Sequence, residues 1–150
     1  MAERGKSGVG TAARAPAGYS GTPLTKKLGV KDGQLMWRSK MPASVAEEIA
    51  EYGVSPQLVK VPRAGLAMAH VFVTSKRELA EHLSRLREVL ASDGVVWVSW
   101  PKKASGVATD VTEDVVREIC LPLGLVDIKV CAVDAVWSGL KLVIRKSERG

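Results

Sequence analysis

The sequence predicts one α/β domain in three layers, with a mostly parallel sheet covered by helices on both faces. Three observations support this prediction. Short apolar strands alternate with helical segments of about ten to fifteen residues, which is the pattern of right-handed βαβ units. The chain of 150 residues is long enough for one ordinary core. Its last two predicted strands follow each other closely enough to pair antiparallel.

The clearest elements lie in the second half of the chain. Residues 67–74 form an apolar run suited to a strand buried on both faces, and Ser75 with Glu78 forms a capping box directly after it. A helix follows, with one apolar stripe that ends at the turn of Asp93 and Gly94. The stripe consists of Leu79, Leu83, Leu86 and Leu90. Residues 95–100 are the strongest predicted strand.

The chain closes with a helix and two strands. Asp110 and Glu113 are expected to open the helix and Pro122 to stop it. Residues 127–133 and 140–145 then read as strands joined across residues 137–139.

The first half is predicted with the same local rules. Caps, prolines and glycines mark two helices, and short apolar runs mark two strands. The first expected helix is short, is capped by Thr22 with Pro23 in its first turn, and ends at Gly29; a strand at 34–38 follows it. The second expected helix is opened by Pro42 with a capping box of Ser44 and Glu47, and it ends at Gly53. A minimal strand at 58–61 comes next.

Charge divides the chain into a tail and a body. Residues 1–18 are predicted to be a flexible basic tail, and residues 19–150 the single domain. The net charge of +6 lies entirely in residues 1–40, which carry eight basic and two acidic residues; residues 41–150 carry fourteen of each. The tail is either simply solvated or a weak electrostatic tether to nucleic acid or anionic lipid.

Composition also bounds the compartment. The N-terminus lacks the apolar region of a signal peptide, and no stretch approaches the roughly 20 apolar residues of a spanning helix, so we expect a cytoplasmic protein. Cys120 and Cys131 belong to no metal-binding motif. We expect both to be reduced core residues, and no metal site.

Several sequence segments resemble those of known folds. Residues 86–97 (LREVLASDGVVW), the order of the elements and the closing strand pair resemble the back half of a Rossmann-like methyltransferase fold. More narrowly, the chain after Tyr19 resembles an uncharacterised bacterial family known as domain of unknown function 3052. The phrases that carry this likeness are YSGTPL (19–24), LGV (28–30), WPKK (100–103), LPLGL (121–125) and WSGL (137–140). The family has no established activity, so the resemblance implies a fold and a bacterial origin only.

The methyltransferase comparison can be tested on the residues. Such enzymes bind S-adenosylmethionine at a glycine-rich turn after strand one and hold its ribose with an acid after strand two. Here residues 39–42 (SKMP) contain no glycine, and residues 60–63 (KVPR) contain no acid. Too few residues separate the second predicted strand from the next for a further strand and its helices. We therefore expect a shortened fold, no cofactor, and no binding of S-adenosylmethionine.

A ligand crevice can still be located. Open α/β sheets bind ligands at the carboxyl ends of strands, at the point where the strand order reverses. Hydroxyls, lysines, an aromatic ring and a helix N-terminus are expected to meet there, a suitable setting for an anion. The alternative is a helix cap, a core tryptophan and solvated lysines. The candidate residues are Ser39, Lys40, Thr74, Ser75, Trp100, Lys102 and Lys103.

Other chemistry-bearing residues have simpler explanations. His70 lies inside an apolar strand and His82 on a helix, and neither has an evident catalytic partner in the sequence. Glu113 and Asp114 lie in a helix's first turn, where they favour the helix dipole.

The function that the sequence favours is a binding domain, non-catalytic or vestigial, that recognises an anionic small molecule or a protein partner. Two alternatives stay open. The first is a transferase dependent on S-adenosylmethionine or a nucleotide, and the second is weak nucleic-acid binding through the basic tail. The sequence does not specify the oligomeric state.

Overall fold

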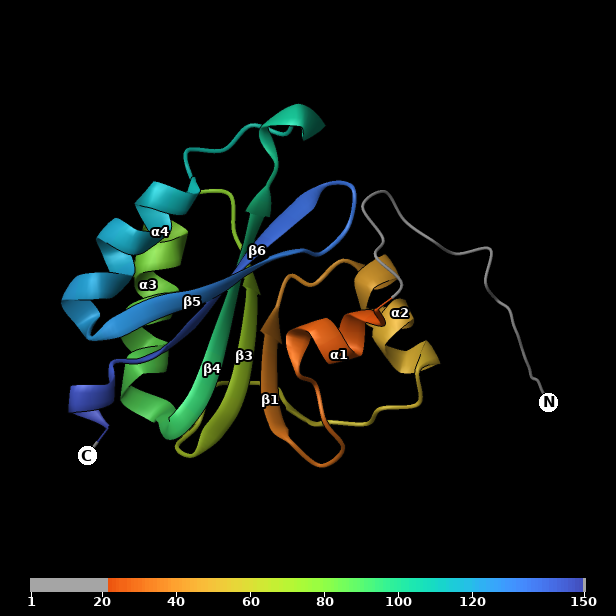
Figure 1. The fold of residues 1–150 in the computed structure, drawn as a ribbon, viewed down its shortest axis with the longest axis horizontal. Helices are drawn as coiled ribbons and strands as arrows, with labels where there is room; N and C mark the ends of the chain where they lie inside the picture. Colours follow the sequence, from red (N-terminus) through yellow and green to blue (C-terminus); the bar gives the residue numbers. More distant parts are fainter. Residues whose placement is uncertain (1–21, 150) are drawn as a thin grey trace.

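The computed structural model describes residues 22–149. Its six strands form one sheet in the order β2-β1-β3-β4-β6-β5 (Figure 1). The first four of these strands run parallel, and β6 is antiparallel to both of its neighbours. The strands are β1 (Leu35–Ser39), β2 (Gln57–Val59), β3 (Leu66–Phe72), β4 (Leu90–Pro101), β5 (Leu125–Ala132) and β6 (Trp137–Ile144). The predicted mostly parallel sheet with an antiparallel C-terminal strand is confirmed.

Helices cover both faces of the sheet, as predicted. α3 and α4 lie together on one side, and α1 and α2 lie together on the other (Figure 1). The helices are α1 (Leu24–Leu28), α2 (Ala43–Glu51), α3 (Lys76–Val89) and α4 (Glu113–Cys120); single 3-10 turns cover Lys103–Ser105, Leu121–Leu123 and Lys146–Glu148. Within residues 22–149 no helix is long and apolar enough to cross a bilayer.

Each face of the sheet has its own apolar core. On one side Leu79, Leu83 and Leu86 of α3 pack with the valines of β3 and β4. On the other side Leu28 and Ile49 pack with a cluster that includes Met36, Phe72 and Trp97. Both cysteines are free and buried, one in each core, as expected. The alternation of side chains along the strands explains why two cores form on one sheet.

The predicted helix caps are only partly correct. The Ser75 hydroxyl accepts a hydrogen bond from the Glu78 N–H at 3.1 Å and opens α3, as predicted. At α4, however, the cap is Thr112, whose hydroxyl accepts from the Val115 N–H at 3.2 Å. The predicted opener Asp110 instead accepts from the Lys76 N–H at 2.8 Å. This carboxylate therefore stabilises the first turn of α3, a contact between segments far apart in the chain.

The two N-terminal helices use proline in place of the predicted side-chain caps. Pro23 and Pro42 are the residues before α1 and α2, and neither helix has a side-chain cap. The prediction of Thr22 as a cap, and of a capping box formed by Ser44, is therefore wrong. Because Pro42 takes the cap position, Ser44 falls inside the first turn, where its hydroxyl cannot cap. Gly29 does end α1, with φ at 79°.

The end of α3 also differs from the prediction. The helix stops at Val89 and β4 begins at Leu90, so the expected turn of Asp93 and Gly94 lies inside the strand. Leu90 pairs with Leu66 of β3, and the register then shifts before regular pairing resumes at Val95. Leu90 is buried in the same core as the α3 leucines. The apolar stripe therefore runs on into the strand, which conceals the helix end in the sequence.

We predicted the turn between the closing strands at residues 137–139, and this prediction is wrong. Those residues belong to β6 and pair with the end of β4. The turn falls at residues 133–136, where the Asp134 carboxylate accepts hydrogen bonds from Val136 N–H and Trp137 N–H, both at 2.8 Å. Gly139 serves close packing instead, since a Cβ there would meet Ser99 Oγ at 3.3 Å and Val133 Cγ2 at 3.2 Å.

The connection between β2 and β3 is short, and it contains no helix. The indole N–H of Trp37 donates to the carbonyl of Lys60 at 3.2 Å, just after β2, and Gly65 N–H donates to Val89 O at 2.9 Å, just before β3. The expected shortening of the fold is visible here. The predicted tail of residues 1–18 lies outside the described residues.

Candidate functional site

The strand order reverses between β1 and β3. From β1 the chain winds outward through α2 to β2, whereas from β3 it winds the opposite way through α3 to β4. The carboxyl ends of β1 and β3 are therefore the switch point of the sheet, where open α/β folds bind ligands. Register confirms that the two ends meet, because Ser39 pairs with Val71.

A pocket of about 560 Å³ lies at this switch point. It falls within the ~300–1,000 Å³ range of small-molecule sites. Half of its lining residues are exposed and half are half-buried, so it is open to solvent. The lining residues are Ser39, Lys40, Thr74, Ser75, Arg77, Glu78, Glu81 and His82. Four of the predicted site residues, Ser39, Lys40, Thr74 and Ser75, thus come together as expected.

Lys40 has an unusual backbone. It follows β1 with φ at 58°, and it is the one non-glycine residue with positive φ in the described chain. That left-handed conformation normally favours glycine and costs other residues roughly 1–2 kcal/mol. Its ammonium group lies 2.7 Å from Glu78 Oε2. One residue of the turn after strand one therefore takes a backbone conformation that glycine favours, although the turn contains no glycine, and its side chain places a cation at the pocket.

The charges of the pocket balance. Lys40 pairs with Glu78, and Arg77 pairs more loosely with Glu81 at 3.6 Å. Burial acts to raise the pKa of Glu78, but the hydrogen bonds from Lys40 and from Thr74 N–H outweigh it and lower that pKa. Glu78 is therefore ionised at neutral pH. The site offers carboxylates and cations side by side, a different setting from the electropositive edge that we predicted.

His82 lies in the pocket wall with its Nε2 atom 3.5 Å from Ser39 Oγ. Its ring meets Trp37 edge-on, with ring centroids 5.4 Å apart. Burial lowers the pKa of His82 and outweighs the opposing effect of Glu78. The imidazole is therefore neutral at neutral pH and can accept a proton.

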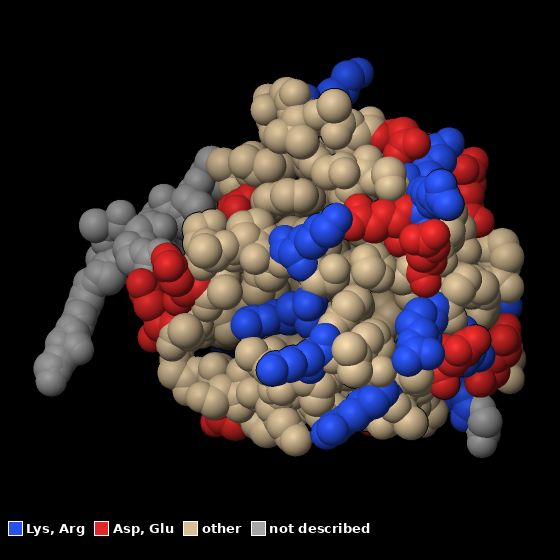
Figure 2. Space-filling view, turned by 180° about the vertical axis from the view of Figure 1, so that it is seen from behind, with Lys and Arg blue, Asp and Glu red and all other residues tan. Residues whose placement is uncertain are grey.

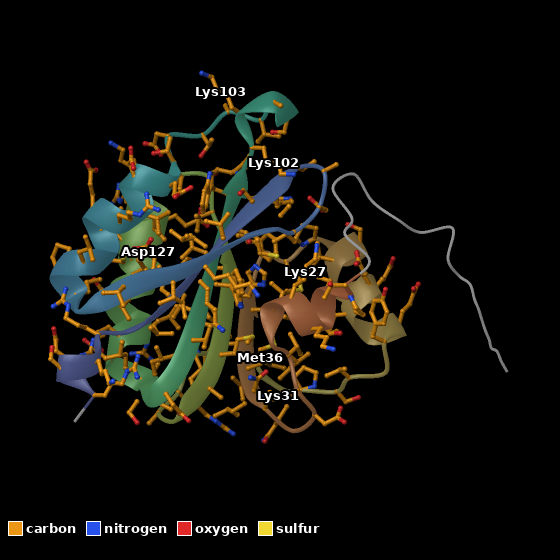
Figure 3. The ribbon with its side chains drawn as sticks, viewed as in Figure 1. Lys27, Lys31, Met36, Lys102, Lys103 and Asp127 are labelled. Carbon is orange, nitrogen blue, oxygen red and sulfur yellow. The ribbon has the colours of Figure 1, made fainter. Side chains whose placement is uncertain are left out.

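The other three predicted site residues lie elsewhere. Trp100 is buried in the core on the α3 side. Lys102 is held at the β6 hairpin, where its N–H donates to Val136 O at 2.7 Å. Lys103 projects from the loop above β4, well away from the switch point (Figure 3). None of the three lines the pocket, because β4 continues beyond the level at which β1 and β3 end.

Sequence reasoning missed four residues of the site: Arg77, Glu78, Glu81 and His82. All lie on α3 directly after the N-cap Ser75, and spacings of three and four place several of them on one side of the helix. That periodicity could have grouped them. Their proximity to Ser39 and Lys40 is a long-range contact that no local pattern shows. Within residues 22–149, no group of three His, Cys, Asp or Glu could hold a metal ion.

Several solved structures with a similar architecture are methyltransferases. A methyltransferase dependent on S-adenosylmethionine from Aquifex aeolicus matches with a TM-score of 0.58 and 14% identity over 81% of this chain and 88% of that chain. The fold is that of the methyltransferases. Magnesium protoporphyrin IX methyltransferase from Synechocystis, with S-adenosylmethionine bound, has a TM-score of 0.53 and 12% identity over 81% of this chain and 74% of its own. A methyltransferase from Pyrococcus furiosus gives 0.52 and 11%, over 79% and 78%.

Sequence comparison adds no family. No protein-family model matches the chain, and no curated protein matches it. The resemblance to domain of unknown function 3052 therefore stays a prediction, whereas the likeness to a methyltransferase fold is confirmed.

The expectation about cofactors was wrong. We expected no cofactor and no binding of S-adenosylmethionine, because the sequence lacks a glycine turn after strand one and an acid after strand two. Structures with this fold include one that holds S-adenosylmethionine. Physically, Lys40 adopts the glycine-like conformation itself, and α3 brings acids to the pocket. Neither missing sequence feature excludes the cofactor.

Proposed function

We propose that the switch-point pocket binds S-adenosylmethionine and that the protein is a methyltransferase. The observation that carries the proposal is the pocket of about 560 Å³ between the carboxyl ends of β1 and β3. Its place in the sheet is the ligand position of open α/β folds. The S-adenosylmethionine complex of a protein with this fold supports the same choice.

The residues of the pocket suit the cofactor's mixed charge. S-adenosylmethionine carries a carboxylate, an amino group, a ribose with two hydroxyls and a positively charged sulfur. Lys40 and Arg77 can hold the carboxylate, and Glu78 and Glu81 can accept hydrogen bonds from the hydroxyls or the amino group. These acids replace the acid that is missing after β2.

The bound cofactor would supply a methyl group activated by its sulfonium. The protein would then have to receive the proton that the acceptor atom loses. His82 is suited to this role, because it lines the pocket and burial lowers its pKa. Ser39 and Trp37 contact the ring from two directions and hold it in place.

A purely anionic ligand fits this pocket less well. Both cations already lie beside carboxylates, so an added anion would gain little net attraction. A ligand with both charges can satisfy both signs. A non-catalytic binding domain, which the sequence favoured, is therefore the second candidate function. It would bind a ligand in the pocket without transferring a methyl group.

Isothermal titration calorimetry on the full chain tests the binding step. The ligands are S-adenosylmethionine, S-adenosylhomocysteine, ATP and inorganic phosphate, with saturable binding expected for the first two. Arg77→Ala and Glu81→Gln should each weaken binding by about tenfold or more, since hydrogen bonds to charged groups contribute about 1.5–3 kcal/mol. The control variant Lys102→Ala/Lys103→Ala removes two charges outside the pocket and should bind normally.

Two outcomes would contradict the binding proposal: no binding of S-adenosylmethionine, or equal weakening by the control. Transfer is tested with tritiated S-adenosylmethionine and a heat-treated cell extract as acceptor. Label should enter the extract with the wild type and fall sharply with His82→Asn. Binding without any transfer would support the non-catalytic alternative.

A further inference from the structure

Basic side chains gather on one face of the domain although the charges of residues 41–150 balance. Figure 2 shows Lys and Arg side chains spread across the middle of the face seen from behind, beside a group of acids. Three exposed cations lie on segments next to the Trp37 and His82 rings: Lys60, Arg63 and Arg85. We call them the basic face.

A backbone contact places Lys60 near the Trp37 and His82 rings, and helical spacing places Arg85 near them. The Trp37 indole donates to the carbonyl of Lys60, so Lys60 lies beside that ring. His82 of α3 packs edge-on against the same Trp37 ring, and the two rings form a pair. Arg85 follows His82 by three residues and therefore lies one turn along the same side of α3.

Arg63 lies on the short connection between β2 and β3. This connection starts beside Trp37 and ends where Gly65 N–H donates to Val89 O at the end of α3. It therefore runs alongside the helix that carries Arg85. In the described chain no helix joins β2 to β3, so the connection leaves Trp37 half-buried and Arg63 exposed.

These three cations form no ion pairs, unlike several other basic residues of the domain. Arg77, Arg87, Arg117 and Arg145 each pair with an acid. By contrast, the side chains of Lys60, Arg63 and Arg85 are exposed and make no ion pair or hydrogen bond with residues 22–149. Unpaired cations around aromatic rings are the usual components of a surface for nucleic acid, where phosphates need charge and bases need flat rings.

We propose that the basic face binds a nucleic-acid strand, with Lys60, Arg63 and Arg85 on its phosphates and the Trp37–His82 pair beside a base. His82 lies beside this face and also lines the switch-point pocket, so the bound strand lies next to the pocket. The strand is then the methyl acceptor, a step that rests on the proposed function. Strand binding itself does not rest on it.

Fluorescence anisotropy with labelled single-stranded RNA and DNA tests the binding, on the full chain and without cofactor. Loss of three phosphate contacts in Lys60→Ala/Arg63→Ala/Arg85→Ala should lower the slope of log K against log salt by about 2 and weaken binding on the order of 100-fold at ~0.1 M salt. The matched control Lys31→Ala/Lys103→Ala/Lys129→Ala removes three exposed cations elsewhere and should keep the slope to within about one contact.

The proposal is overturned if both triple variants lose affinity equally, or if neither does. It is also overturned if polyglutamate displaces the strand as well as unlabelled oligonucleotide, because the face would then suit an acidic protein. Should the first triple variant unfold, the single variant Arg85→Ala replaces it, with a slope lowered by about 0.7. A protein that binds the strand but not S-adenosylmethionine would remove the proposed function and leave the nucleic-acid face.

Discussion

The Nε2 atom of His70 lies 2.7 Å from Oγ of Ser99, in a part of the core where neither residue is exposed to solvent. The His70 ring stacks on Phe72, and its Nδ1 atom has no hydrogen-bond partner in the described chain. Burial, helped by the nearby charge of Arg38, lowers the pKa of His70 to about 3. The folded protein therefore keeps this histidine neutral.

That neutral histidine should make stability depend on pH. In the unfolded chain its pKa is near 6.5, so below that pH the unfolded state binds a proton that the folded state does not. The contribution of His70 is thus complete above pH 6.5, and it is lost as pH falls toward 3, by up to about 1.4 kcal/mol per pH unit.

Urea unfolding between about pH 6.5 and pH 5 measures this slope before most carboxylates titrate. His70→Gln should flatten it. The control His82→Asn concerns a half-buried histidine whose pKa is also lowered, and it should remove less of the slope. An unchanged slope in His70→Gln would show that another group is responsible.

The hydroxyl of Ser99 should matter for stability. Ser99→Ala leaves the buried His70 ring without its hydrogen-bond partner, and we expect a loss of about 1–3 kcal/mol in the free energy of unfolding. Ser84→Ala is the matched control, because Ser84 is exposed on α3 and its change should fall within about 0.5 kcal/mol. Equal effects in denaturant unfolding would mean that the bond between His70 and Ser99 contributes nothing.

The left-handed backbone of Lys40 can be isolated with two variants. Lys40→Ala and Lys40→Gly both remove the ion pair with Glu78, but only glycine adopts a φ of 58° without strain. Lys40→Gly should therefore be more stable than Lys40→Ala by about 1 kcal/mol. Thermal unfolding of the two variants compares them, and a more stable alanine variant would show that the turn relaxes to another conformation.

The two capping boxes seen in the sequence should respond differently. Ser75→Ala removes the cap of α3 and should cost about 1 kcal/mol. Ser44→Ala, at the box that the structure does not form, should change stability by less than about 0.5 kcal/mol. Chemical denaturation of both variants checks this, and a larger cost at Ser44 would contradict the assignment of Pro42 as the cap.

Local patterns were sufficient for most of the architecture. The cap at Ser75, the leucine stripe of α3 and the glycine at the end of α1 depend on residues close together in the chain, so the sequence displays them directly. The order of strands and helices then implied a parallel sheet and its switch point. On that basis Ser39, Lys40, Thr74 and Ser75 could be placed at one edge from the sequence.

The errors arose where distant segments compete with local preference. Local rules assign Asp110 to the start of α4, but its carboxylate accepts from the Lys76 N–H in the first turn of α3. Residues 137–139 were predicted to be a turn, but they belong to a strand because β4 and β5 pair with them. Lys102 and Lys103 do not line the pocket, because β4 extends beyond the ends of β1 and β3. Each outcome depends on a partner many residues away.

By itself, then, the sequence determined the fold class, the strand and helix order, and the edge of the sheet where a ligand would lie, since these follow from periodicity and caps. Only the tertiary structure decided the chemistry of that edge. It brings Glu78, Glu81 and His82 to the pocket beside the end of β1, and it gives Lys40 a glycine-like backbone. It also leaves Lys60 and Arg85 near the Trp37 and His82 rings, with Arg63 exposed on the connection that follows β2. Charge, burial and pKa depend on neighbours in space, and those neighbours exist only once the sheet has formed.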